Sequence, residues 1–493
     1  MPSGSDWWFM ADKNRIEGVE NWLKAENIDN IECMVADNAG VARGKSISRK
    51  KFLEGVQNRQ IRIPETLFGM TISGDFALND HMSEIERDVM LEPDLNTICT
   101  TPWQPEPTAN VICDAVHENG DPVVFSPRQT LQRVLKLYED EGWRPIVAPE
   151  FEFYLLDKQE TAGVGPKAPA GMSGQCGKAA SPYNIDTPDD ADDVPTPEAP
   201  IGASGSRDQG SALLSIDSLD EFSPFFKEVY SACETQRINI DTLTHEAGAG
   251  QFEFNVEHGP ALGVADQSFL FKRLVKQIAT RHNMFASFMA SPYPNSFGSS
   301  MHIHQSVECI ESGKNIFVTS DGGNSELFLQ HIAGLQKYLQ QAMPLIAPYV
   351  NSYRRFTSEL SAPTNTHWSR ENRSVGLRVP SGPAEARRIE NRVAGSDTNP
   401  YFAIATSLAC GYLGMKEALK PSQEFDGSAY ETQDKTLPRH FLDGLKNMRQ
   451  CDALKDVLGE AFVETFIDSK ELEYENYSSV LSPWETKNLL LTV

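Results

Sequence analysis

Three short segments of this chain place charged or metal-binding side chains at every second position. They are Glu150-x-Glu152, His302-x-His304 and Arg388-x-Glu390-x-Arg392. Each lies in a stretch with the composition of a β-strand, and side chains two apart on a strand point to the same face. Burying so many charges without partners is costly. The three patterns therefore predict strands that line one shared, charged site.

Length and composition limit the class of protein. A chain of 493 residues corresponds to two to four domains at roughly 100–200 residues each. The formal net charge of −25 argues against general binding of nucleic acid or of anionic membranes. No apolar run approaches the roughly 20 residues of a transmembrane helix, and no signal peptide is predicted. The 8 cysteines form no C-x-x-C pair, which favours reduced thiols in a cytoplasm over a disulfide framework.

Helix and strand signals alternate along the chain and predict an α+β fold. Helices are expected over 14–26, 126–141, 218–236, 263–290, 325–343, 398–420 and within 435–475. Strands are expected over 31–35, 144–156, 238–243, 252–256 and 301–307. Residues 1–117 are interpreted as a small domain and 118–493 as a larger one. Within the latter, residues 157–212 are rich in Gly, Pro, Ala, Ser and Asp and predict a flexible surface insertion. The alternative is an ordered active-site flap.

Further acidic residues and the two histidines add metal-binding chemistry. Glu246 and Glu253 bracket a Gly-Ala-Gly turn, where the backbone can approach a ligand closely. Carboxylates with imidazole suit Mg²⁺ or Mn²⁺. Each feature alone has an ordinary explanation: a solvated acidic strand face, a surface turn, or a core histidine. Only their combination indicates a metal site.

Arginines gather in one late segment. They are Arg354, Arg355, Arg373, Arg378, Arg387, Arg388 and Arg392. Guanidinium groups bind phosphate and carboxylate through paired hydrogen bonds, although a basic face pairing with the acidic surface is the alternative. Glutamates and histidine for metals and arginines for anions favour phosphoryl transfer. No P-loop motif and no protein-kinase motif is present.

The motifs resemble those of the glutamine synthetase superfamily in the same order, over about residues 30–465. The resemblance rests on Pro149-Glu150-Phe151-Glu152-Phe153, His245-Glu246 through Glu253, Met301-His302-Ile303-His304, Asn351-Ser352-Tyr353-Arg354-Arg355, Asn372-Arg373 through Arg378-Val379-Pro380, and Arg387-Arg388-Ile389-Glu390-Asn391-Arg392. It implies a small N-terminal β-grasp domain followed by a large catalytic domain.

The resemblance also implies roles for single residues. Two or more Mg²⁺ or Mn²⁺ ions per site would be held by Glu152, Glu246 and Glu253, and by Glu150, His302 and Glu390. Glutamate would be bound by Arg355, Arg392 and Gly298. Nucleotide and phosphates would lie near His304, Ser306, Arg373, Arg378 and Arg388, with Arg373 and Arg378 taking part in catalysis. Asp75 would match the family's aspartate on the ammonium side.

The family reaction uses ATP to convert the γ-carboxylate of L-glutamate to γ-glutamyl phosphate, from which an amine displaces phosphate. This chain departs from ammonia-using members at Ser361, where they have a glutamate that binds ammonium, and at Phe297 before Gly298. The Glu246–Glu253 spacing is also one residue shorter. In these features the chain resembles the γ-glutamylpolyamine synthetase branch, so a primary amine or polyamine such as putrescine is the expected co-substrate.

Several alternatives stay open at this point. They are a glutamine synthetase that uses ammonia, a non-catalytic homologue with a regulatory role, and a guanidino kinase of the same superfamily. The resemblance further implies a homododecamer of two hexameric rings, with each active site formed between one subunit's catalytic domain and its neighbour's N-terminal domain. No nucleic-acid or membrane partner is expected.

Overall fold

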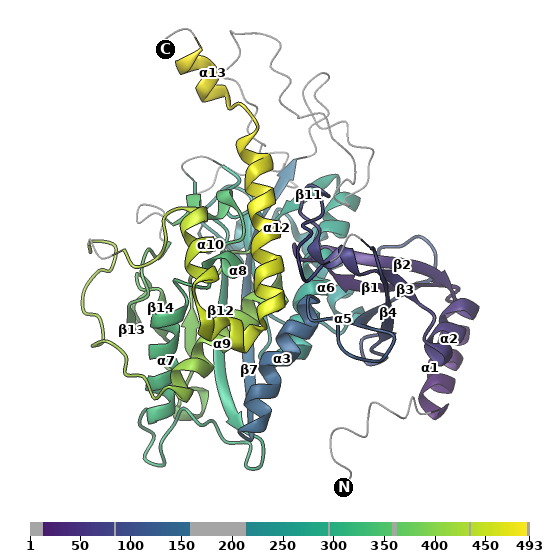
Figure 1. The fold of residues 1–493 in the computed structure, drawn as a ribbon, viewed down its shortest axis with the longest axis horizontal. Coiled ribbons are helices and arrows are strands. Elements are labelled where there is room, and N and C mark those ends of the chain that lie inside the picture. The colour runs from purple at the N-terminus through teal and green to yellow at the C-terminus, as the bar shows by residue number, and fades with distance from the viewer. Residues whose placement is uncertain are drawn as a thin grey trace.

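The computed structural model describes residues 13–82, 85–157, 213–293, 296–356, 362–432 and 435–490. The chain forms two β-sheets with helices around them (Figure 1), which confirms the expected mixture of helices and strands. The predicted insertion 157–212 lies outside the described residues except for Asp157, and so does Ser361. Among the described helices, none is long and apolar enough to cross a membrane.

The first sheet is six-stranded and has the order β2-β1-β6-β4-β3, with β5 on β6. Its elements are α1 (Lys13–Ala25), β1 (Asn30–Ala36), β2 (Ala42–Ser48), α2 (Arg49–Asn58), β3 (Arg62–Pro64), η1 (Glu65–Gly69), β4 (Asp88–Pro93), β5 (Cys99–Thr100) and β6 (Thr108–Val116). The predicted hairpin is present as β1–β2, and β1 runs parallel to β6. These elements share a hydrophobic core centred on residues such as Phe52 and Val111. The boundary at residue 117 and the β-grasp assignment stay predictions.

The second sheet is nine-stranded, in the order β13-β14-β15-β12-β7-β9-β8, with β10 and β11 also pairing with β7. Its strands are β7 (Trp143–Asp157), β8 (Ile240–His245), β9 (Gln251–Val256), β10 (Gly259–Pro260), β11 (Met284–Ser287), β12 (Met301–Cys309), β13 (Trp368–Arg370), β14 (Leu377–Val379) and β15 (Ile389–Asn391). Its helices are α3 (Pro127–Asp140), α4 (Ile216–Asp220), α5 (Ser223–Thr235), α6 (Ala261–Arg281), α7 (Glu326–Tyr338), α8 (Met343–Ile346), η2 (Val350–Arg355), η4 (Ala384–Ala386), α9 (Pro400–Lys416), α10 (Phe441–Arg449), α11 (Asp452–Leu458), α12 (Glu460–Ser478) and α13 (Pro483–Leu489).

Three predicted helices were too long, and one is divided. The helices expected over 325–343 and 398–420 end at Tyr338 and Lys416, and the helix expected over 218–236 is split into α4 and α5. The helix expected over 263–290 ends at Arg281, and β11 follows it. Asn283 has φ +57°, in the left-handed region that asparagine tolerates better than most residues and that a helix cannot contain. This turn sends the chain back onto β7, where Phe285 pairs with Leu156.

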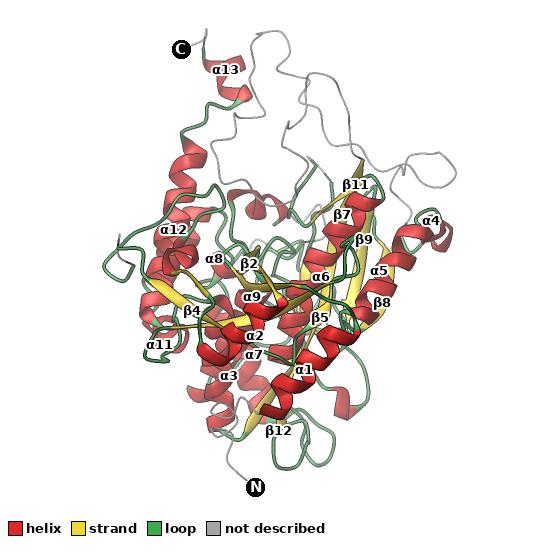
Figure 2. Cartoon of the chain, turned by 90° about the vertical axis from the view of Figure 1, so that its right-hand side faces the viewer, coloured by secondary structure: helices red, strands yellow, loops and turns green. Residues whose placement is uncertain are grey.

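Alternation along the strands gives the large sheet one apolar and one charged face. Phe151 and Phe153 of β7 and Phe254 of β9 are fully buried on the apolar face, where the rings of Phe153 and Phe254 stack with centroids 6.1 Å apart. Figure 2 shows β7 and β9 side by side, with α5 and α6 running along them. Because side chains alternate, the intervening glutamates point to the opposite face.

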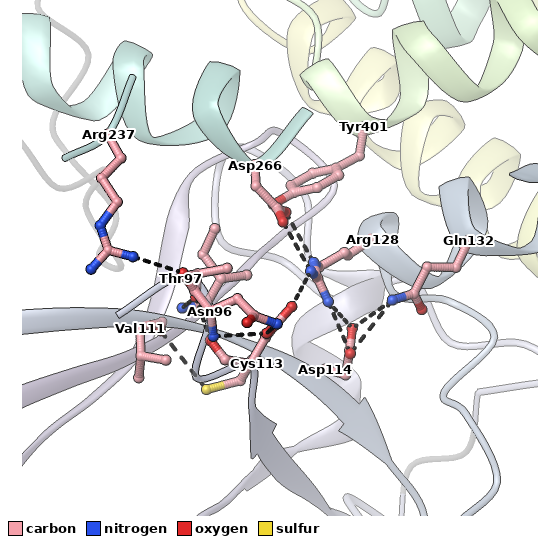
Figure 3. A network of polar contacts seen from close by, with 12 residues as sticks. Asn96, Thr97, Val111, Cys113, Asp114, Arg128, Gln132, Arg237, Asp266 and Tyr401 are labelled. Atoms are coloured by element: carbon pink, nitrogen blue, oxygen red, sulfur yellow. Dashed lines mark hydrogen bonds and ion pairs between the residues drawn. The ribbon is translucent and has the colours of Figure 1, made fainter. Parts of the chain in front are cut away.

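A buried arginine joins the two sheets (Figure 3). Arg128 on α3 donates two hydrogen bonds to Asp114 of β6, at 2.8 and 2.9 Å, and two to Asp266 of α6, both at 2.9 Å. A further bond of 2.8 Å reaches Asp94, just after β4. Tyr401 of α9 donates to Asp266 at 2.6 Å. Burial raises the pKa of Asp114 although Arg128 lowers it, so this carboxylate depends on its partner.

We expect Arg128→Ala to lower the free energy of unfolding by about 3–5 kcal/mol, because three aspartates would lose their shared cation in a buried site. Denaturant titration of the assembled protein measures this loss. Arg133 lies on the same helix but is exposed, so Arg133→Ala should cost less than about 0.5 kcal/mol. Equal stability of the two variants would show that the network contributes nothing.

Candidate active site

The strand register brings the predicted acidic and imidazole groups together on the charged face. Glu150 of β7 lies opposite Asn255 of β9 and His302 of β12. On neighbouring rungs, Glu152 lies opposite Glu253, and His304 opposite Glu390 of β15. Five strands distant in sequence thus contribute to one site, since Arg378 of β14 also lies opposite Glu390.

Glu150 is the acceptor at the centre of this group. Its carboxylate accepts hydrogen bonds from Nδ1 of His302 at 3.1 Å, Nε2 of His304 at 2.9 Å and Nδ2 of Asn255 at 3.2 Å. Burial raises the pKa of Glu150, but the hydrogen bonds from His302 and His304 outweigh burial and hold that pKa below its ordinary value. Glu150 is therefore an anion over the whole physiological pH range.

The glutamates on the other side of the group are crowded. Burial, followed by the charges of four neighbouring glutamates, holds the pKa of Glu253 well above its ordinary value. Burial and then Glu246 raise the pKa of Glu152 to about 7, although Ser300 donates to its carboxylate from Oγ at 2.5 Å and from the backbone N–H at 2.8 Å. Burial also raises the pKa of Glu246, in the turn between β8 and β9. Such a set of carboxylates attracts a cation.

Two triads among the described residues have the geometry of metal ligands. Ligand atoms of Glu150, Glu253 and His302 lie within 4.8 Å of one another, as do those of Glu150, His304 and Glu390. Burial lowers the pKa of His302, which keeps its imidazole in the neutral form that binds metals. Carboxylate oxygens with one imidazole nitrogen match the preference of Mg²⁺ or Mn²⁺.

His304 is held differently from His302. Its Nε2 faces Glu150, and its Nδ1 accepts a hydrogen bond of 3.1 Å from Nε of Arg388. A neutral ring with its proton on Nε2 satisfies both contacts. Both nitrogens are thus engaged, which favours the predicted role beside the nucleotide over that of a metal ligand.

Two arginines lie beside these residues at the β14–β15 edge of the group. Arg378 and Arg392 donate to Glu390 at 2.7 and 2.6 Å. Burial raises the pKa of Glu390, but Arg392 and the nearby histidines outweigh burial and set it at about 2. Nε of both arginines is buried without an acceptor among the described residues. These N–H groups are free to bind an anion.

Arg355, at the end of η2, also has a buried Nε without an acceptor among the described residues. Its side chain is 3% exposed and packs on Gly298, where an added Cβ would lie 2.4 Å from Cγ of Arg355. Burial lowers the pKa of Arg355 to about 10, so it stays charged at neutral pH. A glycine at position 298 is therefore needed for this arginine to reach the site.

The remaining predicted site residues differ in position. Arg373 is exposed, and its charge lowers the pKa of Glu246 against the larger effect of burial. Ser306 follows His304 on the same face of β12 and is partly buried. Ser361 lies outside the described residues.

Asp75 is not brought to this site within the chain. Its carboxylate accepts hydrogen bonds from Ser73 at 3.0 Å and from Asn476 of α12 at 2.8 Å. The backbone N–H of Ile72 in the same loop donates to Glu473 of α12 at 2.8 Å. The prediction that Asp75 serves an active site can therefore hold only for the site of another subunit.

Two residues that support the site were missed in the sequence. Ser300 binds both oxygens of Glu152, and Nε2 of Gln251 donates to Glu152 at 3.3 Å and to the backbone oxygen of Gly298 at 3.0 Å. The same period of two could have found them. Ser300 precedes His302 by two residues, and Gln251 precedes Glu253 by two.

The chain is similar in sequence to known proteins. The profile of the family described as "Glutamine synthetase, catalytic domain" matches residues 124–489. Gamma-glutamylputrescine synthetase PuuA of Escherichia coli (strain K12) is 31% identical over 472 residues, covering 94% of this chain and 92% of the relative. Glutamate–isopropylamine ligase of a Pseudomonas species is 29% identical over 487 residues, covering 97% and 98%.

The fold also matches a solved structure. A GmaS/ADP complex superposes with a TM-score of 0.77 at 24% identity, covering 96% of this chain and 99% of that one. The predicted resemblance and the mixed fold are therefore confirmed. The chain belongs to the glutamine synthetase family, whose members are ATP-dependent ligases that form a carbon–nitrogen bond on glutamate.

Proposed function

We propose that this enzyme joins the γ-carboxylate of L-glutamate to a primary amine or polyamine, such as putrescine, through γ-glutamyl phosphate. The observation that carries the choice of an amine over ammonia is Ser361, which stands where ammonia-using members have a glutamate. Without that carboxylate, an ammonium site would be weakened and a larger amine could be accommodated. Two relatives named for an amine that is joined to glutamate, the gamma-glutamylputrescine synthetase and the glutamate–isopropylamine ligase, support the proposal.

Divalent metal ions fit the residues present. Burial and then the charges of neighbouring glutamates raise the pKa of Glu253, and a cation placed among these carboxylates would offset both effects. Following the family resemblance, we assign Glu152, Glu246 and Glu253 to one Mg²⁺ or Mn²⁺, and Glu150, His302 and Glu390 to a second. The triad of Glu150, Glu253 and His302 then spans the two proposed metal sites. When bound, the ions supply charge neutralisation for the phosphates of ATP. Glu152 retains lone pairs for a metal beside its bonds to Ser300, because a carboxylate offers about four acceptor positions.

The arginines then divide between the two anionic reactants. Following the family resemblance, we assign Arg355 and Arg392, with Gly298, to the carboxylates of glutamate. Their Nε groups, buried and unpaired among the described residues, support the binding of an anion. We assign Arg373, Arg378 and Arg388 to the phosphates, where they would stabilise the charge of the transferring phosphoryl group. We assign His304 and Ser306, both on β12, to the nucleotide.

A ring-shaped homododecamer would complete the site. Asp75 is exposed and lies away from the charged face of its own chain, as expected for a residue that serves a neighbour. We propose that it enters the site of the adjacent subunit and orients or deprotonates the amine. The second candidate function is glutamine synthesis from ammonia, which several relatives support, including a glutamine synthetase of Clostridium saccharobutylicum that is 28% identical over 487 residues.

Replacing Glu253 should affect stability and metal binding in opposite directions. Glu253→Gln removes a crowded charge, so the metal-free protein should gain about 1 kcal/mol of stability at pH 8. The same change should abolish the rise in melting temperature caused by Mn²⁺. It should also lower kcat by more than the roughly 10–100-fold that is typical when a residue that only supports a metal ligand is replaced. Glu257 is exposed just past β9, and Glu257→Gln should change neither quantity. Retention of the Mn²⁺ effect in Glu253→Gln would remove Glu253 from the metal site.

The pKa of Glu152 near 7 predicts how metal stabilisation depends on pH. The folded, metal-free protein holds a proton that the unfolded chain has lost above pH 4.5, so its stability falls as pH rises from 4.5 to 7. A metal ion must displace this proton, so its affinity should rise by up to about tenfold per pH unit per proton. Calorimetry of Mg²⁺ binding at pH 6, 7 and 8 should show proton release that declines with pH. An affinity independent of pH would contradict the prediction.

A panel of amines tests the proposed substrate class. With ATP and glutamate, phosphate release should favour putrescine or another primary amine over ammonia by about 100-fold or more in kcat/KM. Ser361→Glu should shift this ratio toward ammonia by about tenfold, while Ser361→Ala should leave it unchanged. A preference for ammonia in the unmodified enzyme would establish glutamine synthesis instead.

Mixed oligomers test whether sites are shared. Asp75→Asn and Glu253→Gln should each be inactive alone, but co-assembled at equal amounts they should recover up to about a quarter of normal activity, from sites that combine intact halves. Glu390→Gln mixed with Glu253→Gln provides the control, because both residues lie on one sheet and cannot complement. No recovery in the first mixture would place Asp75 outside the neighbouring site.

A further inference from the structure

A second concave site lies between the β1–β2 hairpin and α6. The cavity has a volume of about 290 Å³, and its charged lining consists of Glu32, Arg43, Lys45, Lys272, Arg273 and Lys276. None of these residues belongs to the acidic group on the large sheet. In a chain with a net charge of −25, a cavity lined by five cations and one anion requires an explanation. We call it the hairpin pocket.

Internal ion pairs neutralise only some of these cations. Arg273 pairs with Glu32 at 2.7 Å, and Arg43 pairs with Asp37 at 2.8 Å. Within the described part of the chain, Lys45 and Lys276 form no ion pair. Lys45 is exposed, and Lys276 is partly buried with its Nζ 5.6 Å from the ring centre of Phe288. Burial lowers the pKa of Lys276, and the charge of Asp37, the partner of Arg43, opposes that shift. Each wall of the pocket therefore presents one ammonium group that forms no ion pair.

Two lysines on the α6 wall of the pocket repel each other. Lys272 and Lys276 are one helical turn apart, and Lys272 is buried with its Nζ donating to the backbone oxygens of Ser396 and Thr398 at 2.8 and 2.7 Å. Burial, and then the charge of Lys276, lower the pKa of Lys272 to about 7. An anion placed beside Lys276 would relieve this repulsion.

The hairpin wall is built close to the pocket. Gly44 of β2 lies opposite Met34 of β1, and an added Cβ at position 44 would lie 1.9 Å from the backbone oxygen of Cys33. Its φ of +154° also disfavours any other residue. The glycine separates Arg43 from Lys45 and lets the hairpin stay flat against the pocket.

We propose that the hairpin pocket binds a small dianion, a phosphate group or a dicarboxylate, between Lys45 on the hairpin and Lys276 on α6. The two unpaired ammonium groups match two negative charges, and Arg43 and Arg273 line the space between them. The volume exceeds that of a single phosphate ion, which leaves room for a phosphate ester or a short dicarboxylic acid. A ligand there would join the small sheet to α6. The sheet already contacts the start of α9, where Asn399 donates to the backbone oxygen of Asp37 at 2.8 Å.

Titration calorimetry of the full-length oligomer with inorganic phosphate and with succinate tests this proposal. Lys276→Met and Lys45→Met should each weaken binding of at least one of the two anions by about tenfold. Lys50→Met, an exposed lysine on nearby α2, should leave binding unchanged. Because Lys45 is exposed on a strand, its variant tests the pocket even if Lys276→Met fails to fold.

The outcomes separate the sources of the ligand. Loss of phosphate binding alone identifies a phosphate site, and loss of succinate binding alone identifies a dicarboxylate site. Anion affinities that are equal in Lys45→Met and in the unmodified enzyme would overturn the proposal. A change of oligomeric mass in Lys45→Met without any change in anion binding would also overturn it, because a second copy of the chain would then occupy the pocket.

Discussion

Mutual repulsion among buried glutamates is the constraint on which the active site depends. Glu150, Glu152 and Glu253 stand on adjacent strands of one sheet face, where burial and neighbouring charges raise the pKa values of the last two. The phenylalanines on the opposite face hold these strands in register, so the carboxylates cannot move apart. Hydrogen bonds from histidines and arginines stabilise Glu150 and Glu390. The rest of the repulsion favours a bound cation, which supports the proposed metal site.

Buried arginines bind carboxylates both at the junction of the two sheets and within the candidate site. Arg128 binds three aspartates at the junction of the two sheets and sets the position of the small sheet relative to α6 and α9. Arg378 and Arg392 bind Glu390 within the site. Guanidinium groups suit these positions because they stay charged when buried and donate in several directions. At Arg378 and Arg392, as at Arg355, the Nε group has no acceptor among the described residues, which supports the proposed binding of substrate anions.

The sequence predicted much of the site because a strand has a simple period. Glu150, His302 and Glu390 share a face, as their alternation indicates. The end of α6 was predicted too late in the sequence. The apolar run suggested a longer helix, but the left-handed conformation of Asn283 is incompatible with a helix there. Asp75 could not be located, since the hydrogen bonds of its loop to α12 join residues about 400 positions apart. The network around Arg128 was missed for a similar reason, because its partners come from β6, α6 and the segment after β4.

The sequence by itself therefore determined which side chains of a strand lie on the same face. It also determined which chemical groups are available: carboxylates, imidazoles and guanidinium groups. Both follow from local geometry and residue type. Only the tertiary structure decided which groups meet across strands, which nitrogen of His304 faces Glu150 and which faces Arg388, and that Lys45 and Lys276 stand on opposite walls of one pocket. Those outcomes depend on strand register and on the packing of two sheets, which are set by the burial of distant apolar residues.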